Sequence, residues 1–141
     1  MSSSDSIMPA TPSIEGIVTK HSPFSVEETL KRLQEAMRNR GLTVFARISH
    51  SGEAERIGLK MPESHVLIFG NPKAGSPLIV ATPLLGLDLP PRVLVWQEND
   101  SHVWVSYTSV EYLTARYSIP QELVGNIAGI DRLIESVLHS S

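Results

Sequence analysis

Residues 65–78 read HVLIFGNPKAGSPL, and the stretch divides into two parts of opposite character. The first part, residues 65–70, is a continuous apolar run bounded by turn residues, which is typical of a strand buried on both faces. The second part, residues 71–77, is dense in proline, glycine and other loop formers, which interrupt regular structure. The stretch therefore predicts a buried strand that leads directly into a tight loop.

A short helix is predicted to follow this loop. Ser76 can act as its N-cap, and Pro77 then occupies the first helical position, where proline is favoured. Pro83 cannot continue a helix, because it lacks the backbone N–H and clashes with the preceding turn. The helix is therefore expected over residues 77–82.

A helix and two strands are predicted on the N-terminal side of this stretch. Residues 26–40 place apolar side chains at helical spacing, and Ser25 with Glu28 forms a capping box at the start. Residues 42–50 alternate between apolar and mixed positions, which predicts a strand. Residues 14–20 are rich in β-branched side chains and predict an earlier strand.

On the C-terminal side, the pattern predicts a hairpin and two further helices. Residues 92–97 and 102–108 are alternating runs separated by a short polar turn, which is typical of a hairpin. Residues 109–117 predict a short helix, and residues 120–138 predict a longer one with a continuous apolar stripe.

The predicted order of elements is β-α-β-β-α-β-β-α-α, which indicates an α+β fold. The first strand, helix and second strand could form a right-handed parallel crossover, whereas the hairpin must be antiparallel. We therefore expect a mixed β-sheet of about five strands with helices packed on it. In the last helix, Gly125 and Gly129 lower the helix propensity and are expected to allow tight packing on the sheet.

The composition excludes several classes of protein. A length of 141 residues corresponds to one domain, expected over residues 14–139 behind a disordered tail of residues 1–13. A net charge of −3 lacks the basic footprint of a nucleic-acid binder, and no apolar stretch reaches the ~20 residues of a membrane span. Because the chain has no cysteine, thiolate and cysteine–zinc chemistry are excluded. The tail lacks the features of a secretory signal, so a cytoplasmic location is expected.

Five motifs together resemble those of one known family. They read FARISH at residues 45–50, LIFGNPKAGSPL at 67–78, LDLP at 87–90, VLVWQE at 93–98 and VWVSY at 103–107. The pattern resembles the DUF302 family, whose structures are called TT1751-like, over residues 14–139. The resemblance implies an α+β fold with a mixed sheet, often assembled as a dimer, so a homodimer is expected. It implies no reaction, because the family is one of unknown function.

Two positions depart from the family pattern. Members often carry Asp-His where this chain has Ser49-His50, and Arg-His where it has Arg116-Tyr117. This protein therefore lacks the side chain for any role that requires that carboxylate or that second imidazole.

The loop at residues 70–76 is a candidate ligand site. It has the glycine spacing of a phosphate loop, but Ser76-Pro77 follows where that motif requires a lysine, so an NTPase site is rejected. Because the loop opens a helix, its backbone N–H groups could hold an anion. The residues expected to form this site are Asn71, Lys73, Gly75 and Ser76. A tight strand-to-helix turn that binds nothing is the simpler alternative.

His50 is the second candidate. It ends a predicted strand ahead of a glycine-containing loop, where an imidazole could act as a base or a ligand at neutral pH. A surface or packing role is the simpler alternative. The histidines lack zinc-binding spacing, so no metal is expected. The sequence neither excludes nor favours a histidine as an axial ligand of haem, and it identifies no cofactor.

Three functions follow as hypotheses. The first is a small cytoplasmic protein that binds a small ligand, an anion being one suitable kind, around His50 and Gly70–Ser76. The second is an enzyme of unknown reaction, with His50 as general base and an acid such as Glu55 or Asp88 nearby. The third is a structural dimerisation module without a small-molecule site.

Overall fold

The computed structural model describes residues 11–99 and 101–139. The elements follow one another as β1 (Ile17–Ser22), α1 (Val26–Asn39), β2 (Thr43–Ser49), α2 (His50–Arg56), β3 (Ser64–Gly70), α3 (Pro72–Ala81), η2 (Pro83–Leu87), β4 (Arg92–Gln97), β5 (Val103–Thr108), α4 (Val110–Tyr117) and α5 (Gln121–Leu138). This is the expected order, with the short helix α2 added between β2 and β3 and the single turn η2 added after α3. Residues 11–13 have no regular secondary structure, and the rest of the predicted tail lies outside the described residues.

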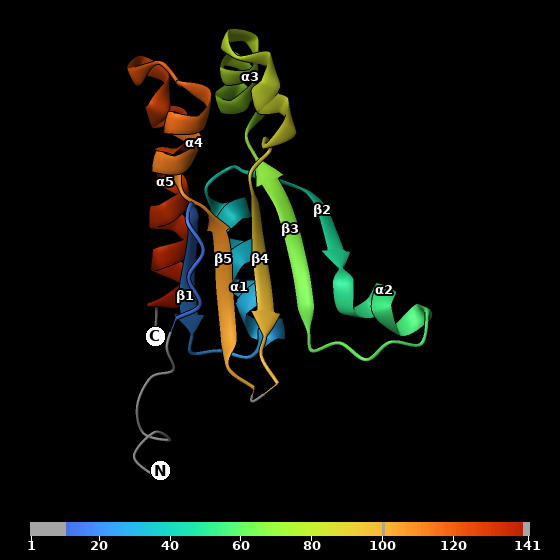
Figure 1. The fold of residues 1–141 in the computed structure, drawn as a ribbon. Coiled ribbons are helices and arrows are strands. Elements are labelled where there is room, and N and C mark those ends of the chain that lie inside the picture. Colours follow the sequence, from blue (N-terminus) through green and yellow to red (C-terminus); the bar gives the residue numbers. More distant parts are fainter. Residues whose placement is uncertain (1–10, 100, 140–141) are drawn as a thin grey trace.

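The five strands form one sheet in the order β1-β5-β4-β3-β2 (Figure 1). The α+β class is therefore confirmed, but the expected mixed sheet is not, because every neighbouring pair is antiparallel. β1 and β2 do run in the same direction, but they occupy opposite edges of the sheet, because β1 pairs with β5. α1 thus carries the chain across the whole sheet instead of to a neighbouring strand.

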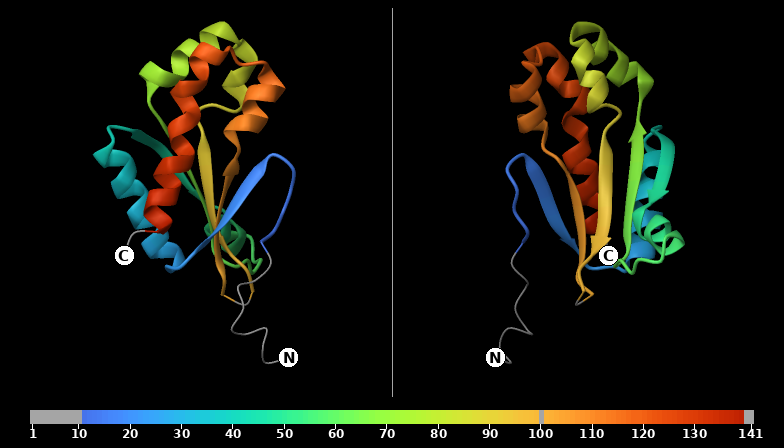
Figure 2. Two further views of the ribbon diagram at one scale, coloured as in Figure 1. Left: turned by 90° about the vertical axis from the view of Figure 1, so that its left-hand side faces the viewer. Right: turned by 45° about the vertical axis from the view of Figure 1, so that its right-hand side comes forward.

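α1 and α5 cover one face of the sheet and form the main core with it (Figure 2). α1 begins as predicted, since the Ser25 side chain accepts a hydrogen bond of 3.1 Å from the Glu28 N–H. Its buried stripe includes Leu30 and Leu33. This stripe packs with residues of β3, β4 and α5, which include Leu67, Val95, Leu133 and Ile134. The apolar residues at helical spacing in the sequence therefore lie on the side of α1 that faces the sheet.

A second apolar cluster lies beyond the end of the sheet, where α3, η2, α4 and the start of α5 meet (Figure 2). Its buried members are Leu78, Leu85, Leu89, Leu113, Ile119 and Ile127. With its 18 residues, α5 is about 27 Å long at ~1.5 Å per residue, long enough to pack on both clusters. Ile130 of α5 contacts both of them.

The two glycines of α5 do not serve the close packing that was expected of them. Both are exposed, and a Cβ atom added at Gly125 or Gly129 would meet no atom within 4 Å. The contacts with the sheet come from the larger side chains of the apolar stripe, such as Leu133 and Ile134. None of the described helices, including α5, has both the length and the apolar character needed to cross a membrane.

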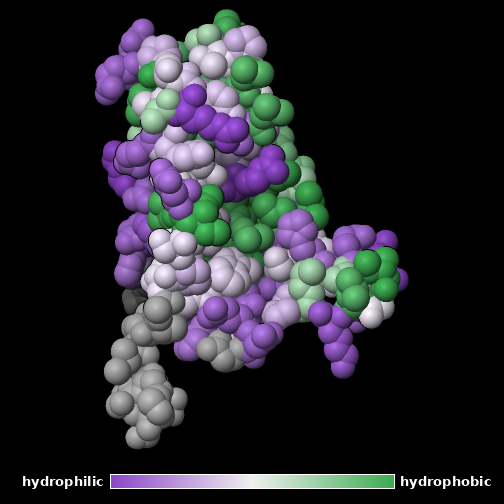
Figure 3. Space-filling model, viewed as in Figure 1, coloured by the Kyte–Doolittle hydropathy of each residue, from purple (hydrophilic) through white to green (hydrophobic). Residues whose placement is uncertain are grey.

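None of the described helices covers the opposite face of the sheet, and we call this face the open face. It is turned toward the viewer in Figure 1, with α1 passing behind the strands. In the same view, hydrophobic side chains gather over the middle of the sheet (Figure 3). Ile17 and Ile48, on the two edge strands, are 38% and 40% exposed.

Candidate functional site

The structure places the two predicted parts of the site at opposite ends of one strand pair. Ser49, which precedes His50, pairs with His65 near the start of β3, whereas Gly70 ends β3 beside the first residue of β2. The five steps of strand from His65 to Gly70 span about 17 Å at ~3.4 Å per residue. One small ligand therefore does not contact both His50 and the segment at residues 70–76.

The predicted loop is the first part of α3, which begins at Pro72 and not near Pro77. Asn71 is the N-cap, because its side-chain oxygen accepts a hydrogen bond of 2.9 Å from the Lys73 N–H. Pro72 then occupies the favoured first turn, and Pro77 lies inside the helix. Asn71-Pro72 and Ser76-Pro77 satisfy the same cap-and-proline rule, and asparagine caps as well as serine, so the sequence rule did not distinguish them.

The start of α3 leaves few backbone donors for an anion. The Lys73 N–H bonds to the Asn71 side chain, and the Ala74 and Gly75 N–H groups both bond to the Asn71 carbonyl oxygen at 2.9 Å. Pro72 has no N–H to offer. The Lys73 side chain is exposed and does not line the pocket beside the helix. The predicted anion site therefore lacks the free N–H groups on which it was based.

A pocket of about 290 Å³ lies beside α3, where the two apolar clusters meet. It is bounded by the end of β3, the proline pair at residues 90–91, and helices α3 and α5. Most of its lining is apolar, and the larger side chains are Phe45, Phe69, Ile79, Leu89, Ile127 and Ile130. Phe69 belongs to the main core and Leu89 to the second cluster, so the pocket marks the junction between them.

Three of the predicted site residues line this pocket, namely Asn71, Gly75 and Ser76. Lys73 and His50 do not line it. Gly70 also contributes, and a Cβ atom there would lie 3.4 Å from Pro91 Cδ, at ordinary van der Waals contact. The proline pair therefore lies directly beside the end of β3.

Most of the lining residues were not predicted as site residues, and Phe45 and Asn126 show why. Phe45 lies on β2, where the register shifts between Val44 and Ala46, and such a bulge breaks the two-residue alternation used to assign faces. Asn126 lies on α5, and its side-chain amide donates a hydrogen bond of 2.9 Å to the Ala74 carbonyl oxygen of α3. The one sequence signal for Asn126 was its polar side chain beside the apolar stripe of α5.

His50 is exposed and is the first residue of α2. The preceding Ser49 caps this helix, since its hydroxyl oxygen accepts a hydrogen bond of 2.9 Å from the Gly52 N–H. His50 lines a shallow hollow over the open face, together with Ile48 and Arg92.

No carboxylate among the described residues lines the hollow that contains His50. Of the two acids proposed as its partner, Glu55 lines a separate hollow beside α2. Asp88 accepts a hydrogen bond from the Tyr117 hydroxyl and lies 3.6 Å from the Arg116 guanidinium. Neither of the two proposed acids therefore lines the hollow of His50, and no other described carboxylate does.

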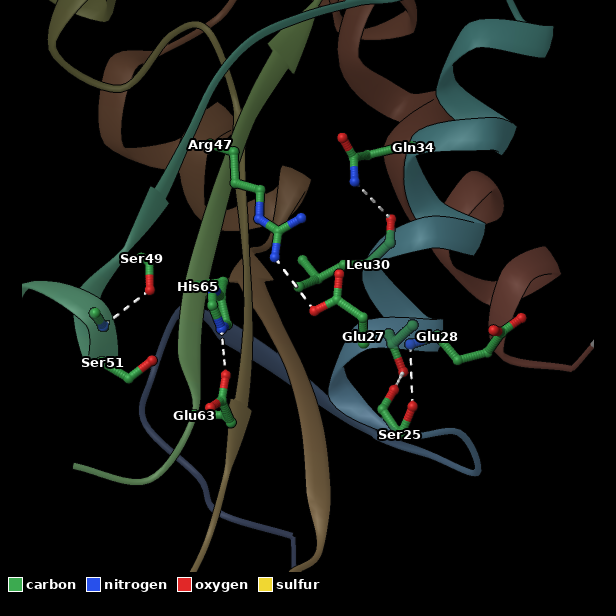
Figure 4. A network of polar contacts seen from close by, with 12 residues as sticks. Ser25, Glu27, Glu28, Leu30, Gln34, Arg47, Ser49, Ser51, Glu63 and His65 are labelled. Atoms are coloured by element: carbon green, nitrogen blue, oxygen red, sulfur yellow. Dashed lines mark hydrogen bonds and ion pairs between the residues drawn. The ribbon is translucent and has the colours of Figure 1, made fainter. Parts of the chain in front are cut away.

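A buried histidine and a nearby ion pair lie at the other end of β3 (Figure 4). The His65 Nε2 atom lies 2.6 Å from a Glu63 carboxylate oxygen, and its buried Nδ1 atom has no hydrogen-bond partner. Arg47 of β2 pairs with Glu27 of α1 at 3.5 Å. None of the hollows described above is lined by His65. Among residues 11–99 and 101–139, no three His, Cys, Asp or Glu side chains lie close enough to hold a metal ion.

Taken together, these features define a small α+β protein with a five-stranded antiparallel sheet, helices on one face, and an apolar pocket at the junction of two cores. The family model described as "Domain of unknown function DUF302" matches residues 18–138, and the chain belongs to this family. A solved structure of an uncharacterized conserved DUF302 protein from Bacillus stearothermophilus has the same fold, with a TM-score of 0.73 and 21% identity. The similarity covers 89% of this chain and 97% of that one.

The chain aligns with only part of the length of each curated relative. A protein named fluoride-specific ion channel FluC 1, from Brucella suis, is 36% identical over 104 residues. The FluC 1 of Brucella abortus and the FluC 2 of Brucella melitensis match to the same extent. The aligned region covers 74% of this chain but 38–41% of those proteins.

Proposed function

We propose that this protein binds a small, largely apolar and uncharged molecule in the pocket between β3, α3 and α5. The observation that carries the proposal is a concave space of about 290 Å³ with an apolar lining and a few polar atoms at its edge. Ligand sites of proteins typically combine these two properties and begin at about 300 Å³, so a compact ligand suits this pocket.

The polar atoms of the pocket indicate what kind of ligand it suits. Among the described residues that line the pocket, none is Lys, Arg, His, Asp or Glu. The Asn71 side-chain oxygen and the Asn126 amide already take part in hydrogen bonds. The Ser76 hydroxyl has no hydrogen-bond partner among the described residues and can bond to a ligand. Because burying a charge without a partner is costly, a neutral ligand with one hydrogen-bonding group is favoured over an anion.

The alternative of an enzyme with His50 as general base has less support. His50 is exposed and lies far from the pocket, and none of the described residues that line its hollow is a carboxylate. A binding role needs only the pocket, so it is the simpler proposal. A cytoplasmic location stays part of the proposal.

Gly75 offers a direct test, because it lines the pocket and a Cβ atom there would meet no atom within 4 Å. Gly75→Leu should fill the pocket without disturbing the helix. Gly125→Leu is the matched control, since Gly125 is also a helical glycine with free space around it but does not line the pocket.

The probes are indole, which is apolar and neutral, and indole-3-carboxylate, which has the same ring and a negative charge. Binding is followed by ¹H–¹⁵N NMR titration. We expect indole to shift the signals of Ala74, Gly75 and Ile127, and to bind at least about tenfold more tightly than the acid, or ~1.4 kcal/mol. Gly75→Leu should abolish these shifts, and Gly125→Leu should keep them. Shifts that persist in Gly75→Leu, or preferred binding of the acid, would contradict the proposal.

A further inference from the structure

The open face presents a continuous row of uncharged side chains across all five strands. The strand register places Thr19, Ser106, Leu94, Val66 and Ile48 side by side in this order. The hollow over this row has a volume of about 540 Å³, within the range of about 300–1,000 Å³ that is typical of ligand sites. It shares no lining residue with the pocket of the proposed function, so it is a separate candidate site.

Polar side chains on the floor of this hollow bond to one another. The Trp96 indole N–H donates a hydrogen bond of 2.9 Å to the Ser106 hydroxyl. The Ser106 and Thr19 hydroxyl oxygens lie 2.8 Å apart and share a second hydrogen bond. Between these groups and the edge of β2, the floor consists of the apolar side chains of Leu94, Val66 and Ile48. A hydrocarbon chain bound there would remove apolar surface from water without leaving these polar groups unpaired.

The charged groups of the hollow are basic. Arg92 of β4 is exposed and has no hydrogen bond or ion pair among the described residues. The strand register places it beside Ile68 of β3. His50 lies toward the other end of the hollow, because the residue before it pairs with His65. Among the described lining residues there is no Asp or Glu, so the hollow complements a molecule with an apolar body and an anionic group.

We propose that the open face binds a free carboxylate with a single hydrocarbon chain, whose head pairs with Arg92 and whose chain lies on Leu94 and Val66. A guanidinium binds a carboxylate through two parallel hydrogen bonds, and it keeps its charge at neutral pH. From Arg92 to Trp96 the floor extends over four steps of strand, about 14 Å at ~3.4 Å per residue, which matches an extended chain of about ten carbon atoms. Because the hollow has the volume of a small-molecule site, a free molecule fits it better than the surface of a bilayer.

The test compares decanoate with 1-decanol, which have chains of the same length and differ in the charge of the head group. Binding to the full chain at neutral pH is followed by ¹H–¹⁵N NMR titration. We expect decanoate to shift the backbone signals of Ile48, Val66 and Leu94 and the indole signal of Trp96. Decanoate should bind at least about tenfold more tightly than 1-decanol, or ~1.4 kcal/mol, because only the carboxylate pairs with Arg92.

Two arginine variants test the role of the charge. Arg92→Gln should lower the affinity for decanoate at least about tenfold and leave the affinity for 1-decanol unchanged, so the preference for the acid disappears. Arg132→Gln is the matched control, because Arg132 is also exposed, has no ion pair among the described residues, and does not line the hollow. This control should keep the wild-type preference. Circular dichroism and the melting temperature establish that both variants are folded.

Several outcomes would overturn the proposal. These are equal affinities for the two probes, an unchanged affinity of Arg92→Gln for decanoate, and decanoate shifts that are absent from Val66 and Leu94. Binding to phosphatidylglycerol vesicles without binding of decanoate would assign the open face to a bilayer instead. A dimer whose open-face signals do not respond to decanoate would assign it to a second copy. Indole binding in the pocket is independent of these outcomes, since the pocket and the hollow share no lining residue.

Discussion

Asn71 shows how one side chain sets the boundary of an element. Its carbonyl and side-chain oxygens together accept hydrogen bonds from the N–H groups of Lys73, Ala74 and Gly75. The segment is therefore helical from Pro72 onward, and these three N–H groups are bonded to Asn71 instead of being free for a ligand. A motif that resembles an anion-binding loop in the sequence becomes one wall of an apolar pocket.

Replacement of this cap tests the boundary. Asn71→Ala should lower the free energy of unfolding by about 1 kcal/mol, because a capping hydrogen bond is lost, whereas Asn71→Ser should cost much less. Ser76→Ala is the control, since the sequence alone made Ser76 the cap but the structure places it inside α3. Urea denaturation measures the free energy of unfolding of all three variants. A larger loss for Ser76→Ala than for Asn71→Ala would contradict the observed helix start.

At the scale of elements, the glycines of α5 provide a second prediction. Gly125→Ala and Gly129→Ala should each raise the free energy of unfolding by about 1 kcal/mol, because alanine favours a helix and both sites have room for a Cβ atom. Gly41 is the contrasting site, since its φ of +75° is left-handed and strains any other residue. Gly41→Ala should therefore destabilise the protein. Thermal and urea unfolding of the three variants distinguish these outcomes.

Most elements could be predicted because their signals are local. The capping box at Ser25 and the apolar spacing of α1 depend on neighbours within one or two turns, and both appear in the structure. The start of α3 could not be predicted, because two cap-and-proline pairs compete within six residues. Phe45 was missed as a pocket residue because a bulge depends on how β2 pairs with β3, which lies about twenty residues away.

For the whole molecule, one polar cluster joins the first strand to the last helix. Lys20 of β1 lies 2.7 Å from Glu135 and 3.1 Å from Asp131, and the Tyr107 hydroxyl of β5 donates a hydrogen bond to Asp131. The hydrogen bond from Tyr107, with that from Lys20, lowers the pKa of Asp131. The hydrogen bond from Lys20 lowers the pKa of Glu135. Burial alone would lower the pKa of Lys20, but its bonds to Glu135 and Asp131 outweigh burial and raise it.

These pKa shifts predict how stability depends on pH. The folded-state pKa values of Asp131 and Glu135 lie below their ordinary values of 3.8 and 4.5. The contribution of these two ionised side chains to the free energy of unfolding is therefore complete above about pH 5. It is lost as the pH falls through their lowered pKa values. Lys20→Met should flatten this acid-side loss and, because both acids are largely exposed, cost less than about 1 kcal/mol at pH 7.

Urea unfolding between pH 2 and pH 7 measures this dependence. Lys31→Met is the control, since Lys31 is exposed on α1 and has no ion pair among the described residues, and it should keep the wild-type pH profile. If Lys20→Met and the wild type lose equal amounts of stability as the pH falls, the cluster does not contribute to stability in this way.

The sequence by itself determined most of the elements, the α+β class and the family, because capping, periodicity and motif spacing act over short distances along the chain. Only the tertiary structure decided that the sheet is antiparallel throughout, since that depends on β1 pairing with β5 at the far edge. It also separated His50 from Gly70–Ser76, which the sequence had combined into one site. Pairing and packing join residues that are distant in the chain, and these contacts decide where a pocket forms and which face of the sheet stays uncovered.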